Sequence, residues 1–232
     1  MKISVIIPVY NEVESINELY KQLLKALQEF SRYEIIFIDD GSSDGSVETI
    51  KKISELDNSI NLIQFHRNYG KSAALAEGFK HAKGNYIVTM DADLQDDPKE
   101  ISNLINKLEE GFDLVSGWKK DRKDPLSKRL PSKLFNFVTR LFTGVNIHDF
   151  NCGLKIYRKA VVKTLELYGG RHRYIPAMAG QKKFKVTEII VNHRPRIYGE
   201  TKYGGSRLFH GLFDLISILF LSKYTQSPMY FF

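Results

Sequence analysis

The chain has 232 residues, of which 43% are hydrophobic and 26% charged, and its formal net charge is +7. This mixture is typical of a globular protein and excludes a disordered chain, a collagen-like repeat and a disulfide scaffold. The single cysteine, Cys152, cannot form an internal disulfide, which favours a reducing compartment. No stretch reaches the ~18–20 consecutive apolar residues of a membrane span. We therefore expect that the chain as given does not cross a bilayer.

The first 117 residues alternate strand-like and helix-like segments. Apolar, β-branched runs predict strands at Ile3–Val9, Glu34–Ile38, Leu62–Phe65, Tyr86–Met90 and Leu114–Val115. Helical patterns lie between them at Ser15–Phe30, Ser46–Leu56, Ser72–Ala82 and Pro98–Glu110, the first opened by a capping box of Ser15 and Glu18. This alternation predicts an α/β fold, with a mostly parallel sheet covered by helices on both faces. In such sheets ligands bind at the carboxyl ends of the strands.

After Gly117 the alternation is less regular. The pattern predicts a helix at Leu126–Phe142, a strand at Gly153–Tyr157, a helix to about Leu167, a strand at Val186–Val191 and an apolar helix at Leu208–Tyr224. We expect one catalytic domain over residues 1–206, followed by an apolar helix and tail at 207–232. The last segment is predicted either to lie at a membrane interface or to be buried against the domain.

Polar residues follow the first four predicted strands, and carboxylates dominate after the second and fourth. The segments concerned are Pro8–Glu12, Asp39–Asp44, Arg67–Lys71 and Asp91–Gln95. Carboxylates crowded at one sheet edge repel each other unless a cation lies among them, and hard oxygen ligands select Mg²⁺ or Mn²⁺. Because Mg²⁺ is usually held by one or two carboxylates plus substrate phosphates, the pattern points to a nucleoside diphosphate. The alternative for Asp39-Asp40-Gly41 is a plain turn.

The positive charge is concentrated in one stretch. Eight basic residues between Lys119 and Arg140 are opposed only by Asp121 and Asp124, so these 22 residues carry +6 of the total +7. Such a cluster predicts a surface for phosphate, anionic lipid or nucleic acid, with a solvated helix face as the alternative.

Several segments together resemble a known enzyme family. PVYNE, DDGSSDGS, RNYGKSAALAEGF and MDADLQDDP, in this order, resemble the family 2 inverting glycosyltransferases with the GT-A fold. SGWKKDRKDP, HDFNCGLKIYR, LYGGRHRYIPA and NHRPRIYGETKYG are similar to its polyprenyl-phosphate branch, which loads sugars onto dolichyl or undecaprenyl phosphate. The resemblance spans essentially the whole chain. It implies a nucleotide-sugar half at about 1–117 and an acceptor half at about 118–206.

The resemblance also implies residue roles. It assigns nucleotide-sugar binding to Pro8, Tyr10, Glu12, Ile38, Asp39, Asp40, Lys71, Asp91, Ala92 and Gln95. It makes Asp91 and Asp93 the ligands of a divalent Mg²⁺ or Mn²⁺ ion. Lys119 stands where several relatives carry an arginine at the phosphates, which keeps the charge and loses the bidentate fork. The implied acceptor-phosphate residues are Lys128, Arg129, Arg194, Arg196, Lys202 and Ser206.

Asp93, Asp149 and Lys119 are the predicted catalytic residues. For Asp149 two roles stay open, a general base and a residue that orients a basic side chain or the loop. The implied partners are a nucleoside-diphosphate sugar, a polyprenyl-phosphate lipid and the membrane surface, without nucleic acid and with a homo-oligomer left open. Since relatives continue into transmembrane helices, we expect the full-length protein to be integral at the cytoplasmic membrane face, and the chain as given to be peripheral.

Three alternatives compete with this interpretation. The first is a family 2 transferase whose acceptor is a glycan or another lipid. The second, from a different class, is a non-catalytic basic module that binds membrane or RNA, which leaves the acidic strand ends unexplained. The third is a nucleotidyltransferase, which also pairs carboxylates with a metal and would release pyrophosphate rather than a nucleoside diphosphate.

Overall fold

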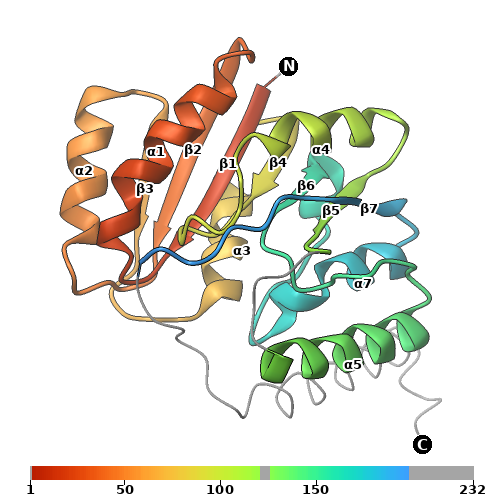
Figure 1. Ribbon diagram of the computed structural model, residues 1–232. Helices are drawn as coiled ribbons and strands as arrows, with labels where there is room; N and C mark the ends of the chain where they lie inside the picture. The colour runs from red at the N-terminus through yellow and green to blue at the C-terminus, as the bar shows by residue number, and fades with distance from the viewer. Residues whose placement is uncertain (1, 121–125, 199–232) are drawn as a thin grey trace, which may run out of the picture.

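The computed structural model of the chain describes residues 2–120 and 126–198, and of residues 126–131 the backbone alone. It contains a seven-stranded sheet in the order β3-β2-β1-β4-β6-β5-β7 (Figure 1). The strands are β1 (Lys2–Val9), β2 (Arg32–Asp39), β3 (Ile60–Gln64), β4 (Tyr86–Thr89), β5 (Leu114–Trp118), β6 (Lys155–Arg158) and β7 (Val186–Ile190). The helices are α1 (Val13–Leu27), α2 (Ser46–Leu56), α3 (Lys71–His81), α4 (Glu100–Glu109), α5 (Leu126–Thr143), α6 (Lys159–Val162), the 3₁₀ turn η1 (Arg171–Tyr174) and α7 (Ile175–Gln181).

The sheet is parallel except for one strand. β1 pairs in parallel with β2 and β4, β2 with β3, and β5 with β7, whereas β6 runs antiparallel to both β4 and β5. This confirms the predicted α/β class with a mostly parallel sheet. The chain order reverses between β1 and β4, and at such a switch point the loops after the strands separate and leave a crevice for a ligand.

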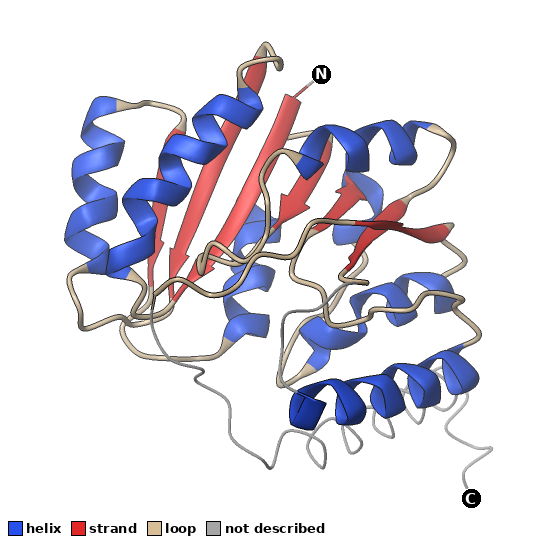
Figure 2. Ribbon diagram, viewed as in Figure 1, coloured by secondary structure: helices blue, strands red, loops and turns tan. Residues whose placement is uncertain are grey.

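Helices cover both faces of the sheet, as Figure 2 shows. β1 is buried on both sides because its apolar run, Ile3–Val9, offers alternate side chains to each face. Ile3, Val5 and Ile7 belong to one core cluster with residues of α1, α2 and α4, and Ile6 belongs to a second with residues of α3 and α7. Two packed layers thus fix the strand ends that carry the polar residues.

Several predicted element boundaries were wrong. α1 begins at Val13 rather than Ser15, and the predicted capping box is absent, because the Ser15 hydroxyl donates to the Glu12 carbonyl oxygen instead. α4 begins at Glu100, and Pro98 lies in the turn before it. The helix expected to reach Leu167 ends at Val162, and α7 was not predicted.

Some expectations fall on residues outside those described, namely the helix at Leu208–Tyr224 and the boundary at residue 206. Across residues 2–120 and 126–198 no helix has both the length and the apolar character needed to cross a membrane.

Candidate active site

The loops after β1 and β2 are tied together at the sheet edge. The backbone N–H of Asn11 donates to the Ser42 hydroxyl over 2.9 Å, and the Asn11 side-chain oxygen accepts the N–H of Ser43 over 2.8 Å. Gly41 has a φ of +75°, and a Cβ there would lie 2.5 Å from the backbone carbon of Arg67. Only glycine therefore allows the β2 loop to approach the β3 loop this closely.

Asp39 and Asp40 are both buried and have different partners. One oxygen of Asp39 accepts the N–H groups of Gly41 and Ser42 at 3.2 and 3.1 Å, while its Oδ1 has no hydrogen-bond partner among the residues that the structure describes. Asp40 accepts the N–H groups of Tyr69 and Gly70 at 2.7 and 2.9 Å. Burial raises the pKa of Asp40 above its ordinary value, and these two hydrogen bonds oppose the rise. Asp40 therefore holds the loop before α3, and Asp39 keeps a vacant acceptor oxygen.

Asp91, directly after β4, is surrounded by lysines. Its carboxylate pairs with the ammonium group of Lys71. Burial alone would raise the pKa of Asp91, but the charges of Lys71, Lys119 and Lys155 bring it well below its ordinary value. A Cβ at Gly153 would lie 2.6 Å from an oxygen of Asp91, so the carboxylate fits here only because residue 153 is glycine.

Asp93 is bridged to the loop after β7. Its Oδ2 lies 2.5 Å from the guanidinium of Arg196, which also lies 3.7 Å from the carboxylate of Glu12. Burial raises the pKa of Asp93 to about 6, helped by the negative charges of Asp91 and Asp96 and opposed by Arg196. The carboxylates at this edge thus repel each other even with the arginine in place.

Lys119 lies beside this acidic cluster at the end of β5. Its ammonium group is 2.8 Å from the carboxylate of Asp96, and its side chain is only 11% exposed. Burial would lower the pKa of Lys119, but the nearby negative charges, chiefly that of Asp96, raise it well above its ordinary value. Lys119 is therefore a buried, permanently charged cation at the site.

The side chain of Arg194 binds Asp97 and Gln22. Its guanidinium pairs with Asp97 at 2.5 Å and donates to the Gln22 side-chain oxygen at 2.7 Å, while its backbone N–H donates to the Gln95 carbonyl at 3.0 Å. These contacts fix the strap 191–198, which runs from β7 across to the end of β1 (Figure 1).

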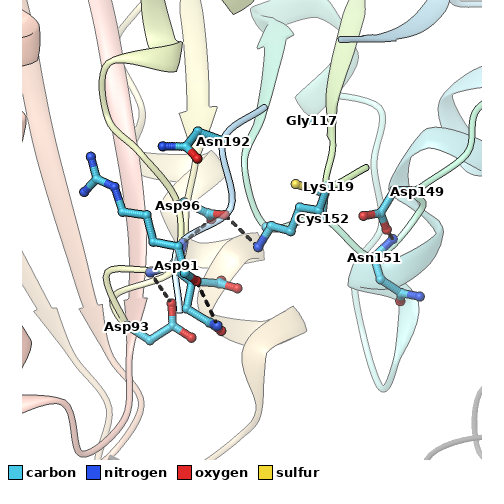
Figure 3. A network of polar contacts seen from close by, with 12 residues as sticks. Asp91, Asp93, Asp96, Gly117, Lys119, Asp149, Asn151, Cys152 and Asn192 are labelled. Atoms are coloured by element: carbon cyan, nitrogen blue, oxygen red, sulfur yellow. Dashed lines mark hydrogen bonds and ion pairs between the residues drawn. The ribbon is translucent and has the colours of Figure 1, made fainter. Parts of the chain in front are cut away.

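Asp149 lies on the far side of Lys119 and Cys152 from Asp91 and Asp93 in the view of Figure 3. It is 1% exposed, and its Oδ1 accepts the N–H of Asn151 over 3.1 Å. Burial raises the pKa of the Cys152 thiol to about 12, so this cysteine is a neutral packing residue at physiological pH.

With this geometry established, comparison with known proteins identifies the family. The model of glycosyl transferase family 2 matches residues 4–166. This chain belongs to glycosyl transferase family 2. A dodecaprenyl-phosphate galacturonate synthase of Rhizobium johnstonii is 37% identical over 238 residues, covering 100% of this chain and 70% of the relative. An undecaprenyl-phosphate 4-deoxy-4-formamido-L-arabinose transferase of Salmonella choleraesuis is 41% identical over 220 residues, covering 94% of this chain and 67% of the relative.

Solved structures show the same fold at lower identity. The glucosyl-3-phosphoglycerate synthase of Mycobacterium tuberculosis, in complex with Mn²⁺, UDP-glucose and phosphoglyceric acid, aligns with a TM-score of 0.74 at 17% identity, covering 94% of this chain and 79% of that one. The match confirms the GT-A fold that the resemblance implied. The curated relatives are polyprenyl-phosphate sugar transferases, so the predicted branch of the family is confirmed as well.

The carboxylate oxygens that this family 2 chain offers are suitable ligands for a divalent metal ion. Asp91 and Asp93 supply hard oxygen ligands, and the raised pKa of Asp93 marks a place where added positive charge is stabilising. Over the residues with described side chains, no group of three His, Cys, Asp or Glu side chains could hold a metal ion. Two carboxylates fit an ion whose remaining ligands come from substrate phosphates and water.

The structure brings most of the described, sequence-predicted residues of this family 2 chain to one edge. Pro8 and Ile38 pair in register on β1 and β2, Tyr10 is 37% exposed just beyond β1, and Ala92 is buried between Asp91 and Asp93. The side chains of Lys128 and Arg129, and all of Lys202 and Ser206, lie outside the described residues. A cluster is formed by Asp91, Asp93, Asp96, Lys71, Lys119 and Arg196. The Arg194 guanidinium pairs with Asp97, and Asp149 lies apart from Asp91 and Asp93 in the view of Figure 3.

Sequence reasoning missed Asp96, Asp97 and Gly153. The two aspartates belong to the motif MDADLQDDP, and the high density of aspartates in this motif was a signal that could have found them. Gly153 gave no signal, because its role depends on the approach of β4 to β6, which is a tertiary property.

Proposed function

We propose that this chain transfers a sugar from a UDP- or GDP-sugar to a polyprenyl phosphate, with inversion at the anomeric carbon. The observation that carries the proposal is the convergence of Asp91, Asp93 and Asp96 with Lys71, Lys119 and Arg196 at the switch point of the sheet. The names of the two curated relatives support the acceptor class.

The donor nucleotide binds over the ends of β1 and β2. The buried Oδ1 of Asp39, which has no hydrogen-bond partner within residues 2–120 and 126–198, offers an acceptor for an N–H group of the base. Pro8, Tyr10, Glu12 and Ile38 line the same edge. Asp40 contributes through the backbone of Tyr69 and Gly70, which it holds before α3. Lys71, Ala92 and Gln95 border the diphosphate.

The proposed cofactor is Mg²⁺ or Mn²⁺, held by Asp91 and Asp93 together with the diphosphate. When bound, such an ion stabilises the negative charge that develops on the departing diphosphate. Lys119 supports the same charge from the protein side, since it is buried, cationic and next to Asp91. The Mn²⁺ in the tuberculosis enzyme supports this assignment.

The acceptor needs little activation. A phosphate monoester has its second pKa near ~6, so it is largely dianionic at neutral pH. One of its oxygens forms the new bond to the anomeric carbon while the bond from that carbon to the diphosphate oxygen breaks, and the electron pair leaves with the diphosphate. The chain must therefore supply cations, which we assign to Lys128, Arg129, Arg196 and Lys202, with Arg194 after release from Asp97. The hydroxyl of Ser206 is assigned as a neutral hydrogen-bond donor to the same phosphate.

Asp149 then has a positioning role rather than that of a base. The nucleophile is already ionised, and the Asp149 carboxylate is buried and accepts a backbone N–H of its own loop. It holds the loop that borders Lys119 and Cys152 (Figure 3).

The lipid acceptor requires contact with the cytoplasmic face of a membrane, and α5 offers a surface for it. Exposed apolar side chains follow a helical spacing along it, at Leu134, Phe137, Leu141 and Phe142, each at least 55% exposed. The same helix overlaps the basic stretch 119–140, so apolar and cationic residues occur together in its sequence as in interfacial helices. We assign residues 1–206 to the catalytic domain and 207–232 to a juxtamembrane segment.

The test is nucleoside-diphosphate release from a panel of UDP- and GDP-sugars, with Mg²⁺ or Mn²⁺, in the presence and absence of undecaprenyl phosphate in mixed micelles. We expect release that requires both the lipid and the metal. Metal-dependent release that ignores the lipid would overturn the acceptor assignment, and release of pyrophosphate would indicate a nucleotidyltransferase.

A further inference from the structure

The loop that carries Asp149 is held by its backbone from three elements. Its N–H groups at His148 and Asp149 donate to Glu188 on β7, over 2.7 and 3.3 Å. The Asp149 carbonyl accepts the Ser116 hydroxyl of β5 at 3.3 Å, and the next N–H donates to Asn136 of α5 at 3.3 Å. The loop is thus fixed by partners that come from outside its own segment.

Glu188 makes the largest share of these contacts. One carboxylate oxygen accepts two consecutive N–H groups, and the other pairs with the imidazole of His148. The side chain is only 11% exposed although β7 is the edge strand of the sheet. Hydrogen bonds to a charged carboxylate are roughly twice as strong as neutral ones. Removal of Glu188 would therefore cost the loop two charge-assisted hydrogen bonds.

The imidazole of His148 connects Glu188 to the end of β5, next to the acidic cluster. Its ring stacks on Trp118, with 4.1 Å between ring centroids and 11° between the ring planes. Trp118 precedes Lys119, the buried cation that pairs with Asp96. Glu188 therefore fixes the Asp149 loop and, through the stacked rings, the end of β5 that presents Lys119.

We propose that Glu188 is a positioning residue for the transfer reaction, acting through the Asp149 loop and the Trp118–His148 stack. Among the described contacts Glu188 makes none with Asp91 or Asp93, so its side chain acts on the site through these two connections, in addition to the backbone pairing of β7 with β5. This inference rests on the proposed function, because a positioning role needs a reaction to position for.

The experiment compares Glu188→Ala, Glu188→Asp and His148→Phe with Glu55→Ala, a control at an exposed glutamate of α2. Glu188→Asp keeps the charge but withdraws the acceptor oxygens, and it serves where Glu188→Ala does not fold. His148→Phe keeps the ring stack and the two backbone hydrogen bonds.

Each protein is assayed for kcat and donor KM with undecaprenyl phosphate. The emission of Trp118, the single tryptophan, reports on the loop.

We expect Glu188→Ala and Glu188→Asp to lower kcat by about 10- to 100-fold with donor KM within about twofold of wild type, because reacting groups are misplaced rather than lost. Their Trp118 emission should change, while His148→Phe should lose less than about threefold in kcat, since the backbone anchors remain.

A Glu188→Asp or Glu188→Ala protein with altered Trp118 emission and wild-type kcat would overturn the positioning role and leave the proposed function intact. Wild-type protein that turns over no donor under any condition would instead overturn the proposed function, and the positioning role with it.

Discussion

The guanidinium of Arg196 lies 2.5 Å from the carboxylate of Asp93, so a residue of the strap after β7 neutralises a carboxylate that follows β4. The same guanidinium lies 3.7 Å from Glu12, after β1. One arginine therefore connects three loops at the sheet edge. In the resting protein it also pairs with a carboxylate that we assign to a metal ion.

Replacement of Arg196 by glutamine should strengthen metal binding in the absence of substrates. In the proposed metal site the arginine competes with the ion for Asp93. A partly exposed pair of this kind is worth about 1 kcal/mol, so the Mn²⁺ dissociation constant should fall about fivefold. Titration calorimetry with Mn²⁺ measures it. Weaker Mn²⁺ binding by Arg196→Gln would show that the arginine does not compete with the ion.

Asp93→Asn should reduce kcat at least about 100-fold while the fold stays intact, because the amide loses the charge that we propose holds the ion against the diphosphate. Activity with Mg²⁺ and Mn²⁺, together with thermal unfolding followed by circular dichroism, checks both parts. A mutant with a near-normal rate would remove Asp93 from the catalytic residues.

Gly153→Ala should lower kcat by about 10- to 100-fold, because a Cβ there would lie 2.6 Å from the Asp91 carboxylate and push it out of place. The matched control is Gly111→Ala. Gly111 has open space around its Cβ position but a φ of +101°, so this variant should lose about 1 kcal/mol of stability with unchanged kcat. Equal kcat in the two variants would contradict the role assigned to Gly153.

His172 should make the protein less stable in mild acid. Its Nδ1 lies 2.9 Å from the Ser72 hydroxyl, and burial, with the charges of Lys71 and Arg173, brings its pKa well below the ordinary value of 6.5. Below pH 6.5 the unfolded chain therefore binds a proton that the folded protein does not. Stability is full above that pH and should fall by about 1.4 kcal/mol per pH unit below it, until the folded pKa is reached.

Urea unfolding at pH 7.5 and 5.5 measures this loss. His172→Gln should show a smaller difference between the two pH values than wild type, whereas His66→Gln, at an exposed histidine, should match wild type. An unchanged pH dependence in His172→Gln would rule out His172 as its source.

Phe137→Ser combined with Leu141→Ser should weaken binding to vesicles that contain phosphatidylglycerol by at least about tenfold, since each buried side chain contributes about 1.5–3 kcal/mol. Leu56→Ser, at a leucine of α2 that is 89% exposed, is the matched control. Vesicle cosedimentation measures the bound fraction. Unchanged binding together with an altered oligomeric state would instead assign the face of α5 to a contact between copies of the chain.

The sequence alone determined the α/β class, the strand order along the chain and the segments that carry the site. Alternating apolar runs and helical patterns are local properties, and the acidic motif after β4 lies within a few residues of its strand. The strand–helix alternation over the first 117 residues was enough to predict which ends of the strands would hold Asp39, Asp40, Asp91 and Asp93.

The tertiary structure decided which partners these side chains meet. Asp40 accepts hydrogen bonds from the backbone of Tyr69 and Gly70, and Arg194 forms an ion pair with Asp97. Glu188 accepts a hydrogen bond from Asp149, which is 39 residues away in sequence. The short elements of the second half, α6 and α7, were misjudged because segments this brief depend on packing rather than on propensity. Ion pairs between loops depend on distances in the folded protein, and these distances cannot be read from the spacing of residues along the chain.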